Sequence, residues 1–332
     1  MWKAVTLPDA DRIPWAVWKA LLVAGISLGA IYGLIALGYS LVYGILRMIN
    51  FAHGEVFMAG GMISFFVGRA LGANGYMAAN PWLTLVLLFL VGAAASTAIA
   101  VGLERVAYRP LRNAPRLVPL ITAIGASLLL QNSFQGFFGS QNRGYLVPPG
   151  LEGNVEVLGG STQFLGFDIA KVQLLTIAIG IVSVIVLSLF VAKSRTGRSM
   201  RAVAEDREIA ELMGIDVNRT IVTTFIIGGI FAGIAGVLWG LTSQSVRPTM
   251  GFVPGITAFT AAVLGGIGSV GGAALGGLLI GILSSTAPFL LLRGFNVASP
   301  FQLKDVITFL ILVVVLIFRP TGLLGGSDKE KL

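Results

Sequence analysis

Polar and charged residues interrupt an apolar stretch near residue 50. The sequence Arg47-Met-Ile-Asn50-Phe-Ala-His53-Gly-Glu55 has apolar runs on both sides. A charge near the centre of a bilayer costs about 2.5–3.5 kcal/mol on insertion scales, so such groups normally face protein or water. Two interpretations stay open. The four residues form a polar cap at a helix end, satisfied by one another and by backbone, or Asn50, His53 and Glu55 line a gate or pathway.

Metal and nucleophilic chemistry have little support in the sequence. His53 is the single histidine and the chain has no cysteine. A zinc or iron centre needs three or four ligands, so we predict no metal site. No Gly-Lys dipeptide is present, which excludes a Walker A phosphate loop. A Ser/His/acid triad is conceivable only around His53, where no nucleophile elbow supports it. We therefore expect no catalytic residue and no cofactor in this chain.

A charged segment between residues 193 and 219 has the pattern of an amphipathic helix from residue 200 to 213. Val203, Ala210 and Met213 fall near one face, and Gly214 is a natural residue to follow a helix C-cap. Acidic and basic residues nearly balance here, unlike a loop that only sets topology. Two interpretations are again open. The helix transmits force from a soluble motor, or it is a solvated connector.

A third set of candidates lies in and beside glycine-rich sequence. Residues 248–272 contain two prolines and many glycines, which indicates a broken membrane helix. Free backbone N–H groups at such a break suit a carboxylate, and Thr257 and Thr260 add hydroxyl groups. Gln131 belongs to a polar set in the outer half of the predicted span 117–138. Two interpretations are open for each of these side chains: it lines a pathway, or it makes a hydrogen bond between helices.

Small residues recur at helical spacing in two places. Gly25, Gly29 and Gly33 form a small-xxx-small ladder, and a similar set is Gly272, Gly276 and Gly277. Such faces allow membrane helices to approach closely. We predict that both ladders are mainly sites of helix packing.

The elements that position these residues are membrane-spanning helices. The chain is 55% hydrophobic and 11% charged, against about 25% charged in soluble domains. The candidate spans are 15–38, 56–71, 82–103, 117–138, 172–192, 221–241, 252–268, 271–292 and 306–318. The short apolar segment 39–49 could be a half-helix that makes a second crossing. We predict an all-α polytopic membrane protein with about eight to ten transmembrane helices, some short or broken.

Loop charges predict the topology. Arginines concentrate in loops 104–116 and 193–219, whereas 139–170 has Arg143 against three acidic residues. Lys/Arg excess marks the cytoplasmic side. We therefore expect one transmembrane domain over 1–332, with 193–219 cytoplasmic and 139–170 extracytoplasmic. Because the basic residues lie beside apolar segments, the net charge of +8 does not indicate nucleic-acid binding.

Several motifs resemble a known family in order and spacing over nearly the whole chain. They occupy residues 33–55, 104–112, 201–206, 258–269 and 319–325. They are similar to the H-type permease subunit of high-affinity branched-chain amino acid ABC importers. The resemblance implies the ABC importer permease fold in a multi-pass protein of the cell inner membrane. Segment 139–170 departs most from the family pattern.

The resemblance also implies partners and a coupling site. Segment 201–214 matches the region that docks on the ATPase subunit as a coupling helix, and its candidate residues are Arg201, Glu205, Asp206, Ala210 and Gly214. The implied assembly has a second homologous permease subunit, two ATP-binding cassette subunits that hold ATP and Mg, and an extracytoplasmic solute-binding protein. Membrane lipid is the remaining partner.

Two alternatives for the function stay open at this point. Relatives of this family carry urea, short amides or other amino acids, and the membrane motifs alone do not separate these solutes. The second alternative is a self-contained secondary carrier, which is disfavoured because no carboxylate is predicted in mid-membrane.

Overall fold

The computed structural model describes residues 15–112, 114–115, 117–155, 163–164, 167–289, 300–318 and 321–324. Its α-helices are α2 (Trp15–Leu46), α3 (His53–Ala73), α4 (Tyr76–Ala79), α5 (Pro81–Leu103), α6 (Leu117–Phe138), α7 (Lys171–Lys193), α8 (Arg195–Glu205), α9 (Arg207–Leu212), α10 (Val217–Ser243), α11 (Phe252–Gly265), α12 (Val270–Ala287) and α13 (Lys304–Phe318). The shorter elements are η2 (Glu104–Tyr108), η3 (Arg109–Leu111), η6 (Pro300–Leu303), β1 (Arg143–Gly144), β2 (Gln163–Phe164), β3 (Phe167–Asp168) and β4 (Ser245–Val246).

Long apolar helices dominate the bundle. Within the described ranges, seven are long and apolar enough to cross a membrane: α2, α3, α5, α6, α7, α10 and α12. The helices α11 and α13 are shorter, with 14 and 15 residues. The predicted class, an all-α polytopic membrane protein with some short helices, is confirmed. The predicted end of one span at residue 292 lies outside the described residues.

The first helix is longer than predicted. Helix α2 runs without a break for 32 residues, about 48 Å at 1.5 Å per residue. The hypothesis of a separate half-helix over 39–49 is therefore wrong. No proline interrupts the segment, and its glycines are accommodated by close packing. The helix ends at Leu46, and Arg47 follows with a φ of +52° in the left-handed region.

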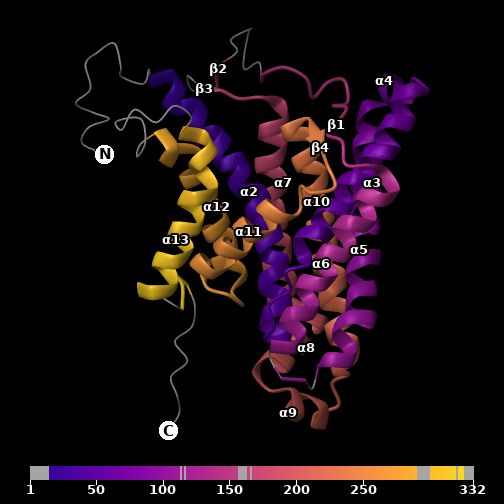
Figure 1. Ribbon diagram of the computed structural model, residues 1–332, viewed down its shortest axis with the longest axis vertical. Helices are drawn as coiled ribbons and strands as arrows, with labels where there is room; N and C mark the ends of the chain where they lie inside the picture. Colours follow the sequence, from indigo (N-terminus) through magenta and orange to yellow (C-terminus); the bar gives the residue numbers. More distant parts are fainter. Residues whose placement is uncertain are drawn as a thin grey trace.

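The two ends of the bundle differ (Figure 1). Helices α8 and α9 lie at one end, and strands β1 to β4 lie at the other, with α4. Strand β1 pairs antiparallel with β4, with Arg143 opposite Val246, and β2 pairs antiparallel with β3. The end with α8 and α9 is the α9 end of the bundle, and the end with the strands is its β1 end. The described parts of the arginine-rich loops and of segment 139–170 thus fall at opposite ends.

Glycines set the contact between α2 and α12. A Cβ atom built on Gly29 would lie 2.8 Å from the Cα of Leu278, and one on Gly25 would lie 2.8 Å from the Cα of Ile282. A Cβ on Gly276 would collide with α11 instead. Both predicted ladders are therefore packing faces. The first packs α2 against α12, whereas in the second Gly272 and Gly276 pack against α11 and Gly277 packs against Gly33 of α2.

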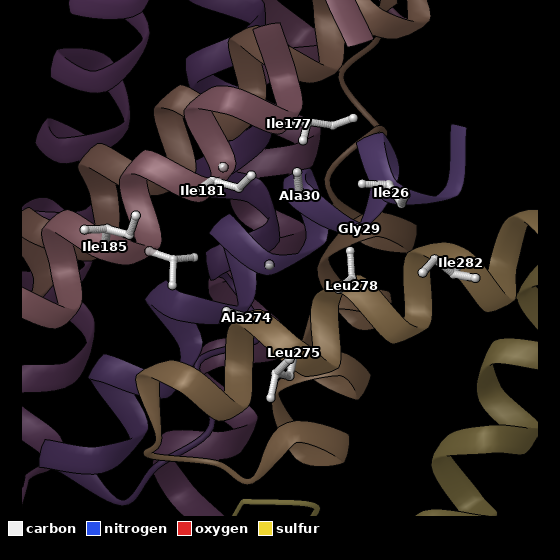
Figure 2. Close-up of a pocket in the computed structure, with 13 residues that line it drawn as sticks. Ile26, Gly29, Ala30, Ile177, Ile181, Ile185, Ala274, Leu275, Leu278 and Ile282 are labelled. Atoms are coloured by element: carbon white, nitrogen blue, oxygen red, sulfur yellow. The ribbon is translucent and has the colours of Figure 1, made fainter. Parts of the chain in front are cut away.

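Beside this contact, α2, α7 and α12 enclose an apolar crease of about 430 Å³. Figure 2 shows Ile26, Ile177 and Ile181 among the side chains around it, and Leu275 and Leu278 on α12. Every residue that lines the crease is aliphatic or glycine. A surface of this kind suits lipid chains, and it offers nothing to a charged solute.

We predict that Gly29→Ala lowers stability. The new methyl group would meet the backbone of α12, which cannot move cheaply, at a cost of about 1–3 kcal/mol. The matched control is Gly102→Ala, because a Cβ there meets nothing within 4 Å. Both changes gain the same helix propensity. Thermal unfolding of the purified variants in detergent checks the prediction, and equal unfolding temperatures for the two would contradict it.

Candidate functional site

The chain turns back into the protein after α2. Residues 47–52 form no regular helix, and α3 begins at His53, which is buried against Gly38 of α2. Gly38 precedes the end of α2 by eight residues, about 12 Å at 1.5 Å per residue. Helix α3 therefore begins inside the bundle and not at its surface.

Helix α11 also begins inside the bundle. The chain descends from β4 through a non-helical stretch before α11 starts, partway along the bundle (Figure 1). A Cβ on Gly54 would lie 2.5 Å from the carbonyl oxygen of Gly251 and 3.0 Å from the Cα of Gly255. The first turns of α3 and α11 thus touch backbone to backbone. The predicted break in 248–272 is present here, and α11 then ends at Gly265, three residues earlier than predicted.

Glu55 lies at this junction. It is 1% exposed, and its Oε1 accepts a hydrogen bond of 3.3 Å from Ser127 of α6. Among the described residues its Oε2 has no hydrogen-bond partner, and a Cβ on Gly251 would lie 2.6 Å from it. The N-terminal ends of α3 and α11 meet beside this carboxyl group. Glu55 therefore connects α3, α6 and the start of α11.

Aromatic rings fill the space from this junction toward the α9 end. The rings of Tyr39 and His53 pack edge to face with centroids 4.9 Å apart. Phe259 packs on Tyr39 at 5.9 Å and on Phe51 at 5.6 Å. The cavity that remains beside Tyr39 and Asn50 holds only about 10 Å³. This is about the smallest volume that holds one water molecule, so the packed rings leave no room for a solute here.

Asn50 is tied to the end of α5, a link that the sequence did not predict. Its Oδ1 accepts a hydrogen bond of 2.5 Å from the hydroxyl group of Tyr108. Tyr108 belongs to the π-helical turn η2, and such turns are frequent at functional sites. In the same turn Glu104 is fully buried and forms an ion pair with Arg112, which also donates to Asn218. For this ion pair, the signal in the sequence was Glu104, an acidic residue next to apolar ones. Its partner, eight residues further along the chain, is decided by the π-helical turn.

One interpretation of residues 47–55 was a polar cap satisfied by its own members and by backbone, and only its backbone part agrees with the structure, in the bond made by Arg47. Arg47 donates to the carbonyl oxygen of Ala204, Asn50 accepts from Tyr108, and Glu55 accepts from Ser127. These partners lie on α8, η2 and α6. The segment is a junction between elements, and its role in a gate or pathway stays a prediction.

The other candidate pathway residues lie on separate elements. Thr257 and Thr260 are buried on α11, and Thr260 donates to the carbonyl oxygen of Ile256 in its own helix. Gln131 is half-buried on α6, and Asn132 beside it is exposed. Among the described residues no hydrogen bond joins Gln131 to either threonine. The structure thus places both threonines on α11, the helix whose first turn touches α3, and leaves Gln131 half-buried on α6.

The predicted coupling helix over 200–213 is two helices. Asp206 is extended, with φ −151° and ψ 119°, and it separates α8 from α9. Its carboxylate accepts hydrogen bonds from the backbone N–H groups of Glu208 and Ile209, which makes it the N-cap of α9. Helix α8 also starts earlier, after Ser194. Gly214 follows the second helix with a φ of +80°, as predicted.

The break changes which side chains are buried. Val203 and Ala210 are 1% and 3% exposed, as expected for one face. Met213 is 77% exposed, so its assignment to that face is wrong, because α9 has its own direction after Asp206. Ile209 and Leu212 are exposed as well, at 60% and 87%. Three large apolar side chains are therefore presented outward from α9 and its C-terminus.

Two arginines hold α8 and α9 on the end of α2. Arg207 donates to the carbonyl oxygen of Ile45 at 2.9 Å, and Arg47 donates to that of Ala204 at 3.3 Å. Burial lowers the pKa of Arg207, and the nearby Arg112 and Arg47 lower it further. The remaining candidates are more exposed. Arg201 donates to the carbonyl oxygen of Val191, and Glu205 lies on the surface.

A bundle of membrane-length helices with a buried polar junction and a short helix pair at one end defines a multi-pass membrane protein of the transport class. The family model described as "Branched-chain amino acid transport system / permease component" matches residues 21–316. The chain therefore belongs to this family of permease components.

Curated relatives agree with this assignment. The high-affinity branched-chain amino acid transport system permease protein BraD of Pseudomonas aeruginosa is 42% identical, over 94% of this chain and 97% of its own. The corresponding LivH of Escherichia coli K12 is 42% identical, over 93% and 96%. The autoinducer 2 import system permease protein LsrD of Salmonella paratyphi B is 30% identical, over 81% and 78%.

Proposed function

We propose that this chain is a transmembrane permease subunit of an ABC importer in the cell inner membrane, and that it carries branched-chain or related amino acids inward. The supporting observation is the 42% identity, over more than nine-tenths of both chains, to permeases named for that transport. ATP and Mg would be bound by two ATP-binding cassette subunits. A second homologous permease subunit and an extracytoplasmic solute-binding protein complete the proposed assembly.

In this proposal the α9 end is cytoplasmic. The described parts of both arginine-rich loops lie there, in keeping with the positive-inside rule. Helices α8 and α9 form the coupling site. Ile209, Leu212 and Met213 are large apolar side chains exposed at a water-facing end, where only a protein partner would cover them. An ATPase subunit is the proposed partner.

Movement of α8 and α9 would reach the buried junction through the arginine contacts. Arg207 and Arg47 join these helices to the last turn of α2 and to the segment that follows it. That segment leads directly to Asn50 and then to the start of α3. A shift of α9 therefore acts on the aromatic block around Tyr39 and His53, which closes the bundle toward the cytoplasm.

The outer face of α6 is the proposed contact with the second permease subunit. Asn132 is exposed and Gln131 and Gln135 are half-buried on this helix. Amide side chains are costly against lipid, and they usually face protein or a water-filled path. Helix α7, in contrast, exposes only aliphatic residues over its middle turns and suits the lipid.

The class of solute is tested with the complete complex in proteoliposomes. We expect L-leucine, L-isoleucine or L-valine to stimulate ATP hydrolysis and to be taken up, and urea or acetamide to do neither. Uptake of urea in place of amino acids would favour the alternative within the family. Uptake by this chain alone, driven by an ion gradient, would contradict the proposal and favour a secondary carrier.

We predict that the double substitution Leu212→Ser with Met213→Ser weakens association with the ATPase subunit at least about tenfold, because contacts of apolar anchors of this kind carry more than 1.4 kcal/mol. Co-purification from the membrane measures this. Val106→Ser is the matched control, since Val106 is 80% exposed near the same end but lies on η2. Equal loss in both variants, or none in the first, would refute the docking site.

We predict that Arg47→Gly combined with Arg207→Ala separates ATP hydrolysis from uptake. Glycine tolerates the left-handed backbone at residue 47, so the variant removes side-chain contacts without adding strain. The ATPase subunits should still co-purify and hydrolyse ATP, while uptake per ATP falls several-fold. Arg105→Ala is the control, an exposed arginine at the same end. Unchanged uptake per ATP in the double variant would show that the two contacts do not transmit movement.

A further inference from the structure

A polar cavity of about 240 Å³ opens toward the β1 end of the bundle, on the side of the junction opposite the aromatic block. Its floor is formed by Met250, Val253 and Pro254, at the start of α11. Tyr32 of α2 and Trp239 of α10 form part of its wall, and α13 contributes its first two residues. The cavity therefore ends on the closed contact between α3 and α11.

Charges of both signs surround this cavity. Arg247, Lys304 and Asp305 all line it. Within the described ranges, none of these three side chains forms an ion pair or a hydrogen bond. Opposite charges around one cavity, each without a partner, complement a ligand that itself carries both signs. The aliphatic crease of Figure 2 has no such groups.

The other residues that line the cavity give it an apolar side and a polar side. The rings of Tyr32 and Trp239 lie 6.4 Å apart, and Trp239 also packs edge to face on Phe57 at 6.0 Å. With Met250 and Val253 they offer an apolar surface held in place by the core. Hydroxyl groups come from Ser243, Ser245 and Thr249. Few polar groups beside an apolar wall are typical of small-molecule sites.

We propose that this cavity is the site where the permease receives a free α-amino acid from outside. Its α-ammonium group lies toward Asp305, its α-carboxylate toward Arg247 and Lys304, and its aliphatic side chain toward Tyr32 and Trp239. The first turn of α11 adds the positive end of a helix dipole below the carboxylate. The volume is below the range of about 300–1,000 Å³ for drug-sized ligands, so it suits a solute of this size.

This inference deepens the proposed function and rests on it. A neutral solute such as urea would leave the three charges without a partner. An amino acid satisfies both signs, and it would stand directly above the glycine contact of α3 and α11. Opening of that contact would then release it toward the cytoplasm.

The absence of cysteine from the chain provides a direct test. Ser245→Cys places one thiol in the cavity wall, and Asn74→Cys places one on the same end, exposed and outside the cavity. The purified complex in nanodiscs, without binding protein, is treated with a charged methanethiosulfonate reagent. Mass spectrometry of this chain then reports only the introduced thiol. We expect L-leucine to slow labelling of Ser245→Cys several-fold and to leave Asn74→Cys unchanged.

Three probes with the same aliphatic chain separate the two charges. Isocaproate lacks the ammonium group and isoamylamine lacks the carboxylate, so both should protect Ser245→Cys less than L-leucine does. Asp305→Asn should weaken protection by L-leucine about tenfold, as expected for one charge-assisted hydrogen bond. In this variant L-leucine should protect Ser245→Cys no better than isocaproate does. In the double variant Arg247→Gln with Lys304→Gln, L-leucine should protect Ser245→Cys no better than isoamylamine does. Asp305→Glu should retain protection.

Several outcomes would overturn the site. The first is equal protection by all three probes, and the second is protection by L-leucine that survives both charge variants. The third is no protection by L-leucine although the wild-type complex transports it. In the last case the cavity proposal fails and the proposed function stands. If the complex transports urea and not L-leucine, the proposed function itself fails. Unchanged labelling of Asn74→Cys in every variant verifies that the fold is intact.

Discussion

Two helices of this protein begin inside a membrane-spanning bundle, and the rest of the structure depends on how those ends meet. The first N–H groups of a helix have no partner within it, and such ends are tolerated at membrane depth only where protein or a cavity surrounds them. Here α3 and α11 bring their first turns together through Gly54, Gly251 and Gly255. Side chains larger than hydrogen would hold the two backbones apart. The carboxyl group of Glu55 lies at this meeting point, where it accepts a hydrogen bond from Ser127 of α6.

The neighbouring helices are arranged to support this contact. Helix α2 runs past it for its full length and packs on α12 through glycines, so that both backbones are close and rigid. The far end of α11 is held by Leu323 and Leu324, whose N–H groups donate to the carbonyl oxygens of Leu264 and Gly265. A short helix with both ends tied in this way acts as one body. A polar cavity lies on one side of it and the packed rings of Tyr39, His53 and Phe259 on the other, and under the proposed function this is a path open outward and closed inward.

The contacts of α8 and α9, the proposed attachment point of the ATPase subunit, depend on a different kind of interaction. The exposed apolar side chains of α9 are suited to contact with a protein surface. The arginine contacts are different, because Arg207 of α9 donates to a backbone carbonyl oxygen of α2 and Arg47 donates to one of α8. Carbonyl acceptors at a helix C-terminus are otherwise unpaired, and a cation there is also favoured by the helix dipole. Arg207 therefore satisfies a carbonyl oxygen at the end of α2, and Arg47 satisfies one at the end of α8, so the two contacts attach α8 and α9 to the end of α2.

The sequence by itself determined the membrane class and the approximate position of most helices. Helix α6 was predicted at its observed bounds, because uninterrupted apolar length is a local property, and Gly214 ends α9 as its freedom at positive φ predicts. Only the tertiary structure decided the partners of the buried polar groups. Arg247, Lys304 and Asp305 come together only around one cavity. The pairs Asn50–Tyr108 and Glu104–Arg112 join positions that share no periodicity. Their pairing depends on where a π-helical turn, a broken helix and a left-handed Arg47 direct the chain, and these are consequences of packing between distant segments.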